Sequence, residues 1–149
     1  MGRYRDHEDL TRWVSAFHEA GHAVVHCAAG GRLRTARLTA DDAGHITTRE
    51  NGPHPDRPLD WLAMLLAGHE AATRFLVQHG GYSTGQARSR TRGSARDDLA
   101  AFRRDARGTG ISESRARREA ATRVRRHWGR IQRAAHTLHA TGRLTTSRV

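Results

Sequence analysis

The sequence contains no lysine, a single cysteine and few aromatic residues, and each shortage excludes a class of protein. Without lysine the chain holds no Gly-x-x-x-x-Gly-Lys phosphate loop, which excludes a P-loop nucleotide hydrolase. With Cys27 alone, neither an internal disulfide nor a cysteine metal cluster can form. No segment approaches the roughly 18 consecutive apolar residues of a membrane span, and the N-terminus lacks a signal peptide's apolar core. These shortages predict a soluble, cytoplasmic protein that does not enter a membrane.

The 149 residues fit one domain, 1–149, whose core must come mainly from Ala, Leu and Val because aromatics make up only 5%. Positive charge is concentrated in the second half of the chain. Residues 1–85 carry 9 arginines against 10 acidic residues, whereas residues 86–149 carry 17 arginines against 5 acidic residues. This half of the chain is therefore a candidate contact for nucleic acid or for an acidic partner.

The segment with the most specific chemical pattern is His18-Glu19-Ala20-Gly21-His22, a His-Glu-x-x-His motif. Two histidines four residues apart lie on the same face of a helix and can bind one metal ion. Glu19 is then placed to take a proton from a metal-bound water. The alternative is a core helix with two hydrogen-bonded histidines. The flanking apolar residues follow the spacing of a buried helical stripe: Leu10, Trp13, Val14, Phe17, Gly21, Val24, Val25 and Ala28.

A catalytic zinc takes three protein ligands, so a third group must come from elsewhere in the chain. The metzincin continuation is excluded because Val25 and Ala28 stand where that motif has Gly and His. The remaining candidates are Glu70, on a predicted second helix, and Asp98 or Asp97, at the start of a third. The pattern of residues alone leaves these alternatives open.

Periodicity and turn residues predict a mainly helical fold with one small β-hairpin. The hairpin strands are expected at 32–39 and 45–48, and residues 1–8 are expected to be frayed. Helices are predicted from Asp9 to about Ala29, from Pro58 to Gly80 and over residues 95–108. The Gly-, Ser- and Arg-rich residues 80–94 are predicted to form a flexible loop, and residues 112–141 one C-terminal helix.

Five blocks of sequence occur in the order found in a known family. His18-Glu19-Ala20-Gly21-His22-Ala23-Val24-Val25 resembles the active-site helix of FtsH-type (AAA-linked) zinc peptidases. Arg34–Thr39 with Ala43–Thr47 resembles the family's strand pair, and Leu65–Ala72 resembles its Leu-Ala-Gly helix. Ser83-Thr84-Gly85 and Asp97-Asp98-Leu99 resemble its Ser-Thr-Gly and Asn-Asp-Leu motifs, and the last helix with Gly142–Thr145 resembles its C-terminal helix. The resemblance covers about residues 10–145.

The resemblance implies a zincin-like helical peptidase domain in which His18, His22 and Asp98 hold Zn²⁺ and Glu19 is the catalytic base. Asp97 then takes the place of the Asn in the Asn-Asp-Leu motif, and Glu70 is the weaker alternative ligand. This sequence departs from the family pattern in three ways. His69 replaces an arginine, the segment between Gly85 and Asp98 is longer, and the usual ATPase module and membrane anchor are absent from this sequence.

The expected function is a zinc metalloendopeptidase that hydrolyses flexible peptides, unfolded proteins or tails without an ATPase of its own. A separate ATPase or an acidic protein would be its partner. The alternative is a catalytically silent, peptidase-like binding module that uses its Arg-rich half to contact nucleic acid or an acidic partner. Arg88, Arg90, Arg92 and Arg96, which flank the predicted loop, are the candidate phosphate contacts.

Overall fold

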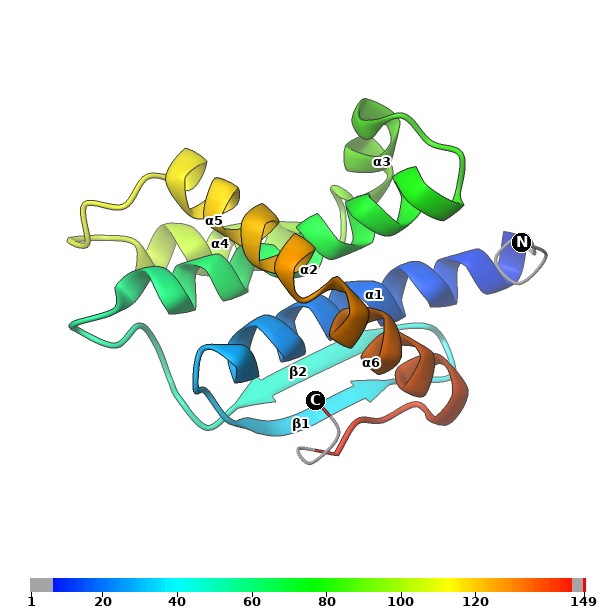
Figure 1. Cartoon of the computed structure of the whole chain (residues 1–149), viewed down its shortest axis with the longest axis horizontal. Helices are drawn as coiled ribbons and strands as arrows, with labels where there is room; N and C mark the ends of the chain where they lie inside the picture. Colours follow the sequence, from blue (N-terminus) through cyan, green and yellow to red (C-terminus); the bar gives the residue numbers. More distant parts are fainter. Residues whose placement is uncertain (1–6, 146–148) are drawn as a thin grey trace.

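The computed structural model describes residues 7–145 and residue 149, which form a mainly helical fold with one two-stranded antiparallel sheet. Helices α1 and α2 lie at the centre, with the sheet on one side of α1 and α5 beyond α2 (Figure 1). The predicted class of mainly helical with a small hairpin is confirmed. The elements are α1 (His7–Ala28), β1 (Leu33–Leu38), β2 (Gly44–Thr48), α2 (Pro58–His79), α3 (Thr84–Thr91), α4 (Arg96–Asp105), α5 (Glu113–Arg126) and α6 (Trp128–Thr141).

The two longest helices, α1 and α2, pack closely because small residues meet where they cross. A Cβ atom on Gly21 would lie 2.6 Å from the carbonyl oxygen of Ala67 and 2.6 Å from Cβ of Ala71. One turn earlier on α1, the ring of Phe17 stacks on Phe75 with centroids 4.4 Å apart. This crossing places the histidine-bearing face of α1 against the first half of α2.

The sheet consists of β1 and β2, paired antiparallel from Leu33 with Thr48 to Leu38 with Gly44. The second edge of β1 is covered by the C-terminal segment, since the amide of Leu38 donates to Gly142 O and that of Leu144 to Ala36 O. No other strand among the described residues pairs with the outer edge of β2. One edge of the sheet is therefore open for backbone pairing.

The segment 80–94, predicted as a flexible loop, contains a helix, so that prediction is wrong. Ser83 caps α3: its hydroxyl accepts from the amide of Gln86 at 3.2 Å, and the Gln86 side chain accepts from the amide of Ser83 at 3.0 Å. Ala87 and Thr91 are buried and turn this helix toward the core. The reciprocal cap and these two buried side chains outweigh a composition typical of loops.

The prediction of one helix over residues 112–141 is also wrong, because the chain breaks at His127. The backbone of His127 (φ −106°, ψ 20°) ends α5 and begins α6. Helix α5 packs mainly on α2, whereas α6 packs on α1 (Figure 1). A single straight helix could not cover both partners, so the break lets Val124 and Ile131 both reach the core.

The remaining predictions of elements are confirmed to within a few residues, and α1 begins at His7. The expectation that residues 1–8 are frayed falls mostly on residues outside the described part. Ala28, predicted in the buried stripe of the first helix, is exposed because α1 ends there. Within the part of the chain that the structure describes, no helix is both long and apolar enough to cross a membrane.

Candidate metal centre

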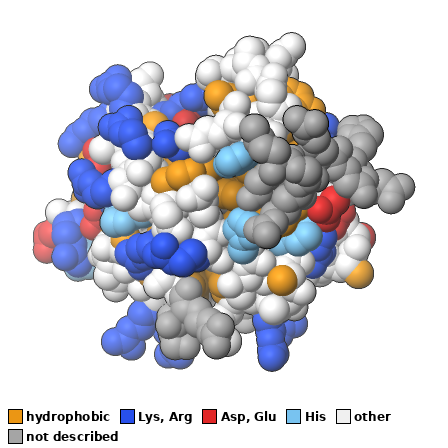
Figure 2. All heavy atoms as spheres, turned by 45° about the vertical axis from the view of Figure 1, so that its right-hand side comes forward, with side chains coloured by type: hydrophobic (Ala, Val, Ile, Leu, Met, Phe, Trp, Pro, Cys, Tyr) orange, Lys and Arg blue, Asp and Glu red, His pale blue; other side chains and the backbone are white. Residues whose placement is uncertain are grey.

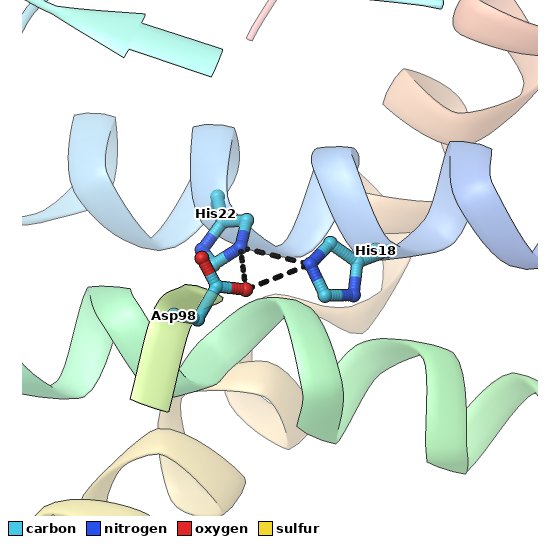
Figure 3. Close-up of side chains that lie close together, drawn as sticks. All are labelled: His18, His22 and Asp98. Atoms are coloured by element: carbon cyan, nitrogen blue, oxygen red, sulfur yellow. Dashed lines mark hydrogen bonds and ion pairs between the residues drawn. The ribbon is translucent and has the colours of Figure 1, made fainter. Parts of the chain in front are cut away.

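Three side chains, two from α1 and one from the start of α4, converge on one point. Nε2 of His18 lies 2.9 Å from Oδ2 of Asp98, and Nε2 of His22 lies 3.0 Å from the same oxygen. The two Nε2 atoms are 3.1 Å apart. Figure 3 shows both imidazoles and the carboxylate pointing at one another. They form the one group among the described residues in which three possible metal-ligating atoms lie this close together.

The third member, Asp98, comes from the first turn of α4. Helix α4 follows α3 after a short turn in which the amide of Ala95 donates to Thr91 O at 3.2 Å. Both helices pack on α2, and this brings the start of α4 over the histidines of α1. Asp98 thus reaches His18 across 80 residues of sequence, which no local pattern specifies.

A hydrogen bond on the far side of the His22 ring determines which nitrogen faces the centre. Nδ1 of His22 lies 2.8 Å from the carbonyl oxygen of Met64, an acceptor, so Nδ1 carries a hydrogen and donates. Nε2 is therefore the atom available to a metal ion, in the arrangement usual for metal-binding histidines. Nδ1 of His18 is buried without a protein partner among the described residues.

The ionisation of His22 and that of Asp98 depend on each other. Burial alone would lower the pKa of His22, but the charge of Asp98 and its hydrogen bond raise it to about 9. Burial opposes ionisation of Asp98 as well, and the charge of His22 with the hydrogen bonds from both histidines lowers its pKa well below the usual range. A divalent cation would replace the Nε2 proton of His22 and keep the same carboxylate compensated.

The residues present fit a metal ion, and α2 carries a glycine at the point where the two imidazoles lie against it. A Cβ atom on Gly68 would lie 2.4 Å from Nε2 of His22 and 2.8 Å from Nε2 of His18. Any side chain at Gly68 would therefore collide with the imidazoles and push them out of this arrangement. Three ligands of a tetrahedral Zn²⁺ stand roughly 3.3 Å apart, close to the 2.9–3.1 Å separations here. Two imidazoles and one carboxylate are also the donor types that zinc binds.

Glu19 lies beside this group with its carboxylate free. It is 8% exposed, and none of the described residues forms a hydrogen bond with its carboxylate. The first residue of β2, Gly44, presses on it, since a Cβ there would lie 2.4 Å from Glu19 Cγ. The carboxylate faces a cleft of about 320 Å³, lined by α1, β2, α2 and the start of α4. A free carboxylate in this position can accept a proton from a molecule bound at the centre.

The two alternative ligands lie elsewhere. Glu70 is buried, and Arg88 and Arg117 donate to its carboxylate at 3.0 and 3.1 Å, so it is held by ion pairs on another side of α2. Asp97 is exposed on the rim of the cleft. The predicted residues that the structure brings together are therefore His18, His22 and Asp98, with Glu19 next to them.

The sequence-based prediction of the site missed two contributors: Gly68 and the carbonyl of Met64. A glycine inside a helical pattern signals a close approach, so Gly68 could have been found. The Met64 carbonyl carries no sequence signal. No protein-family model matches the chain, and a search of curated proteins finds no match. The chemistry of the centre is therefore inferred from its geometry and from the motifs described above.

Proposed function

We propose that this chain is a metal-dependent hydrolase and, more specifically, a zinc metallopeptidase with a zincin-like, FtsH-type fold. The observation that carries the proposal is the convergence of His18, His22 and Asp98 within about 3 Å, beside the unpaired carboxylate of Glu19. Three protein ligands with an adjacent free carboxylate are the composition of a catalytic rather than a structural zinc site.

In this proposal His18, His22 and Asp98 hold Zn²⁺, which when bound lowers the pKa of a water to about 7 and polarises a carbonyl group. Glu19, beside the two histidines, would accept a proton at its carboxylate from the attacking water and pass it to the leaving amine. Met64 holds the His22 ring in the orientation that presents Nε2. Gly68 lets the two imidazoles lie against α2 in this arrangement.

The open edge of β2 supports a peptide as the substrate. This strand lines the cleft through Gly44, Ile46 and Thr48, and its outer edge is unpaired among the described residues. An extended peptide that pairs with this edge would pass in front of Glu19 and the two histidines. Most peptide bonds of a folded protein are held in its own helices and paired strands, so the substrates are flexible peptides, unfolded segments or tails. A separate ATPase that unfolds proteins is a proposed partner, since this sequence has no phosphate loop.

The test is cleavage of a library of unstructured peptides by the zinc-loaded protein, with products identified by mass spectrometry. Wild type should produce pairs of fragments whose summed mass exceeds the substrate by one water. The Glu19→Gln variant should bind zinc as wild type does and lose at least about 100-fold in rate, the scale of a general base. Stoichiometric zinc without any cleavage by wild type would contradict the peptidase proposal and favour the silent binding module.

A further inference from the structure

Helix α5 presents an arginine face that the proposed peptidase chemistry does not use. Four of its six arginines are exposed and have no ion-pair partner among the described residues. The other two point inward, where Arg117 binds Glu70 and Arg123 binds Asp60 and Glu119. The four exposed residues, here called the α5 arginine face, are Arg115, Arg118, Arg125 and Arg126.

These four residues lie on one face of the helix. At about 100° per residue they fall within an arc of about 100°, opposite the buried Ala116, Ala120 and Val124. The face extends about 16 Å along the helix. The structure therefore holds four unneutralised positive charges on one straight, regular element.

The position of the face leaves the cleft free. Helix α5 packs on α2, whereas the sheet packs on α1 (Figure 1). No residue of α5 lines the cleft at the metal centre. The excess of arginine over acidic side chains extends to the surface that Figure 2 shows, where blue side chains outnumber red ones. A large anionic partner could approach α5 while a peptide occupies the cleft.

We propose that the α5 arginine face binds the phosphate backbone of duplex nucleic acid without reading its sequence. Arginine pairs with phosphate through two parallel N–H···O bonds, which suits the planar guanidinium better than a point contact. A duplex carries one charge per roughly 1.7 Å of its axis, so a stretch of about 16 Å offers a phosphate to each arginine. This binding is a further activity and does not depend on the proposed peptidase.

Other anionic partners fit the face less well. Helix α5 has no aromatic residue on which bases of a single strand could stack. It has no bulky apolar side chain on its exposed face, as an interfacial membrane helix would need. An acidic protein would need an apolar patch for the centre of its interface, and the one exposed large hydrophobic residue among those described is Val77 on α2.

Two of the four arginines singled out in the sequence are engaged in other contacts, whereas Arg92 and Arg96 are exposed and have no ion-pair partner among the described residues. Arg88 is bound to Glu70, and the guanidinium of Arg90 lies over the ring of Tyr82, 6.0 Å from its centroid. Both are on α3 rather than on a loop. The α5 arginine face, in contrast, holds all four of its arginines on one helix.

The experiment measures fluorescence anisotropy of a random-sequence 20-base-pair DNA duplex titrated with the full chain at several salt concentrations. Four phosphate contacts contribute a slope of about −3.6 to log K against log salt, or about 150-fold weaker binding between 50 and 200 mM salt. The variant with Arg115, Arg118, Arg125 and Arg126 all changed to Gln should lose most of this slope and of the affinity at low salt. Its metal content should be unchanged.

The matched control removes the same charge from the opposite side of the molecule. Arg34, Arg37, Arg49 and Arg143 are exposed on or beside the hairpin, and changing all four to Gln lowers the net charge equally. This control should keep at least half of the wild-type salt slope. Three results would overturn the proposal: no binding by wild type at 50 mM salt, equal losses in the two variants, or stronger binding to polyglutamate or to anionic vesicles than to the duplex.

Discussion

Replacing Gly68 by alanine tests the fit of the metal centre most specifically, because it adds one methyl group where the two histidines face α2. The new Cβ would lie 2.4 Å from Nε2 of His22 and 2.8 Å from Nε2 of His18, whereas ordinary contacts begin at 3.4 Å. His22 must retreat by about 1 Å, far beyond the roughly 0.2 Å that metal–ligand distances tolerate. We expect the zinc Kd to rise at least 100-fold, equivalent to about 2.7 kcal/mol.

The fold should tolerate this change better than the centre does. Overpacking costs about 1–3 kcal/mol, and alanine regains about 1 kcal/mol over glycine inside a helix. Zinc affinity is measured by competition with a chromophoric chelator, and stability by thermal unfolding with and without zinc. Gly129→Ala is the matched control, since its Cβ would meet only Arg133 Nη1 at 3.5 Å. A Gly68→Ala protein that binds zinc as tightly as wild type would refute this reasoning.

Four further predictions concern protons and ion pairs. Because the pKa of His22 is raised to about 9, zinc binding at pH 7 should release about one proton from this residue, and less as pH approaches 9; calorimetry in buffers of different ionisation enthalpy measures it. The same shift gives metal-free protein a stabilising contribution that is complete below pH 6.5 and lost as pH rises through 9, so its Tm should fall over that range, and His22→Gln should abolish the fall. Burial and the charge of Arg117 lower the pKa of His69 to about 4, so its contribution is present above pH 6.5 and lost as pH falls through 4; His69→Gln should flatten that part of the acid unfolding curve. Glu70→Ala removes the carboxylate that Arg88 and Arg117 share and should cost about 1–3 kcal/mol of stability, since both guanidinium groups are partly exposed and Arg117 keeps Glu113 at 3.6 Å, while the folded protein still binds zinc; loss of zinc by a fully folded Glu70→Ala protein would show that Glu70 is a ligand.

The sequence predicts the elements whose boundaries carry strong local signals. Helix α1 has a regular apolar stripe and ends before Gly30, while α2 begins at Pro58 and ends before Gly80. The sequence analysis did not predict helix α3, because its Gly-, Ser- and Arg-rich composition is typical of a loop and outweighed the capping box of Ser83 and Gln86. The break at His127 carries neither glycine nor proline, since it arises from packing α5 and α6 on different helices.

The members of the metal centre also differ in how far the sequence predicts them. His18, Glu19 and His22 are predicted from a single helical spacing within five consecutive residues. The third member depends on how α4 docks on α2, and the residues alone left Asp98, Asp97 and Glu70 open. The resemblance to FtsH-type peptidases favoured Asp98, the residue that the structure places beside the histidines. The ion pairs of Glu70 belong to tertiary packing and have no local pattern.

Zinc binding by wild type, Asp98→Ala and Asp97→Ala tests the central claim most directly. After equilibrium dialysis against buffered zinc, wild type and Asp97→Ala should each hold about one zinc per chain with the same Kd. Asp98→Ala should lose more than about 100-fold in affinity, the most that losing a supporting hydrogen bond alone costs. Equal affinities of Asp98→Ala and wild type, or a wild type that takes up no zinc, would contradict a centre built from His18, His22 and Asp98.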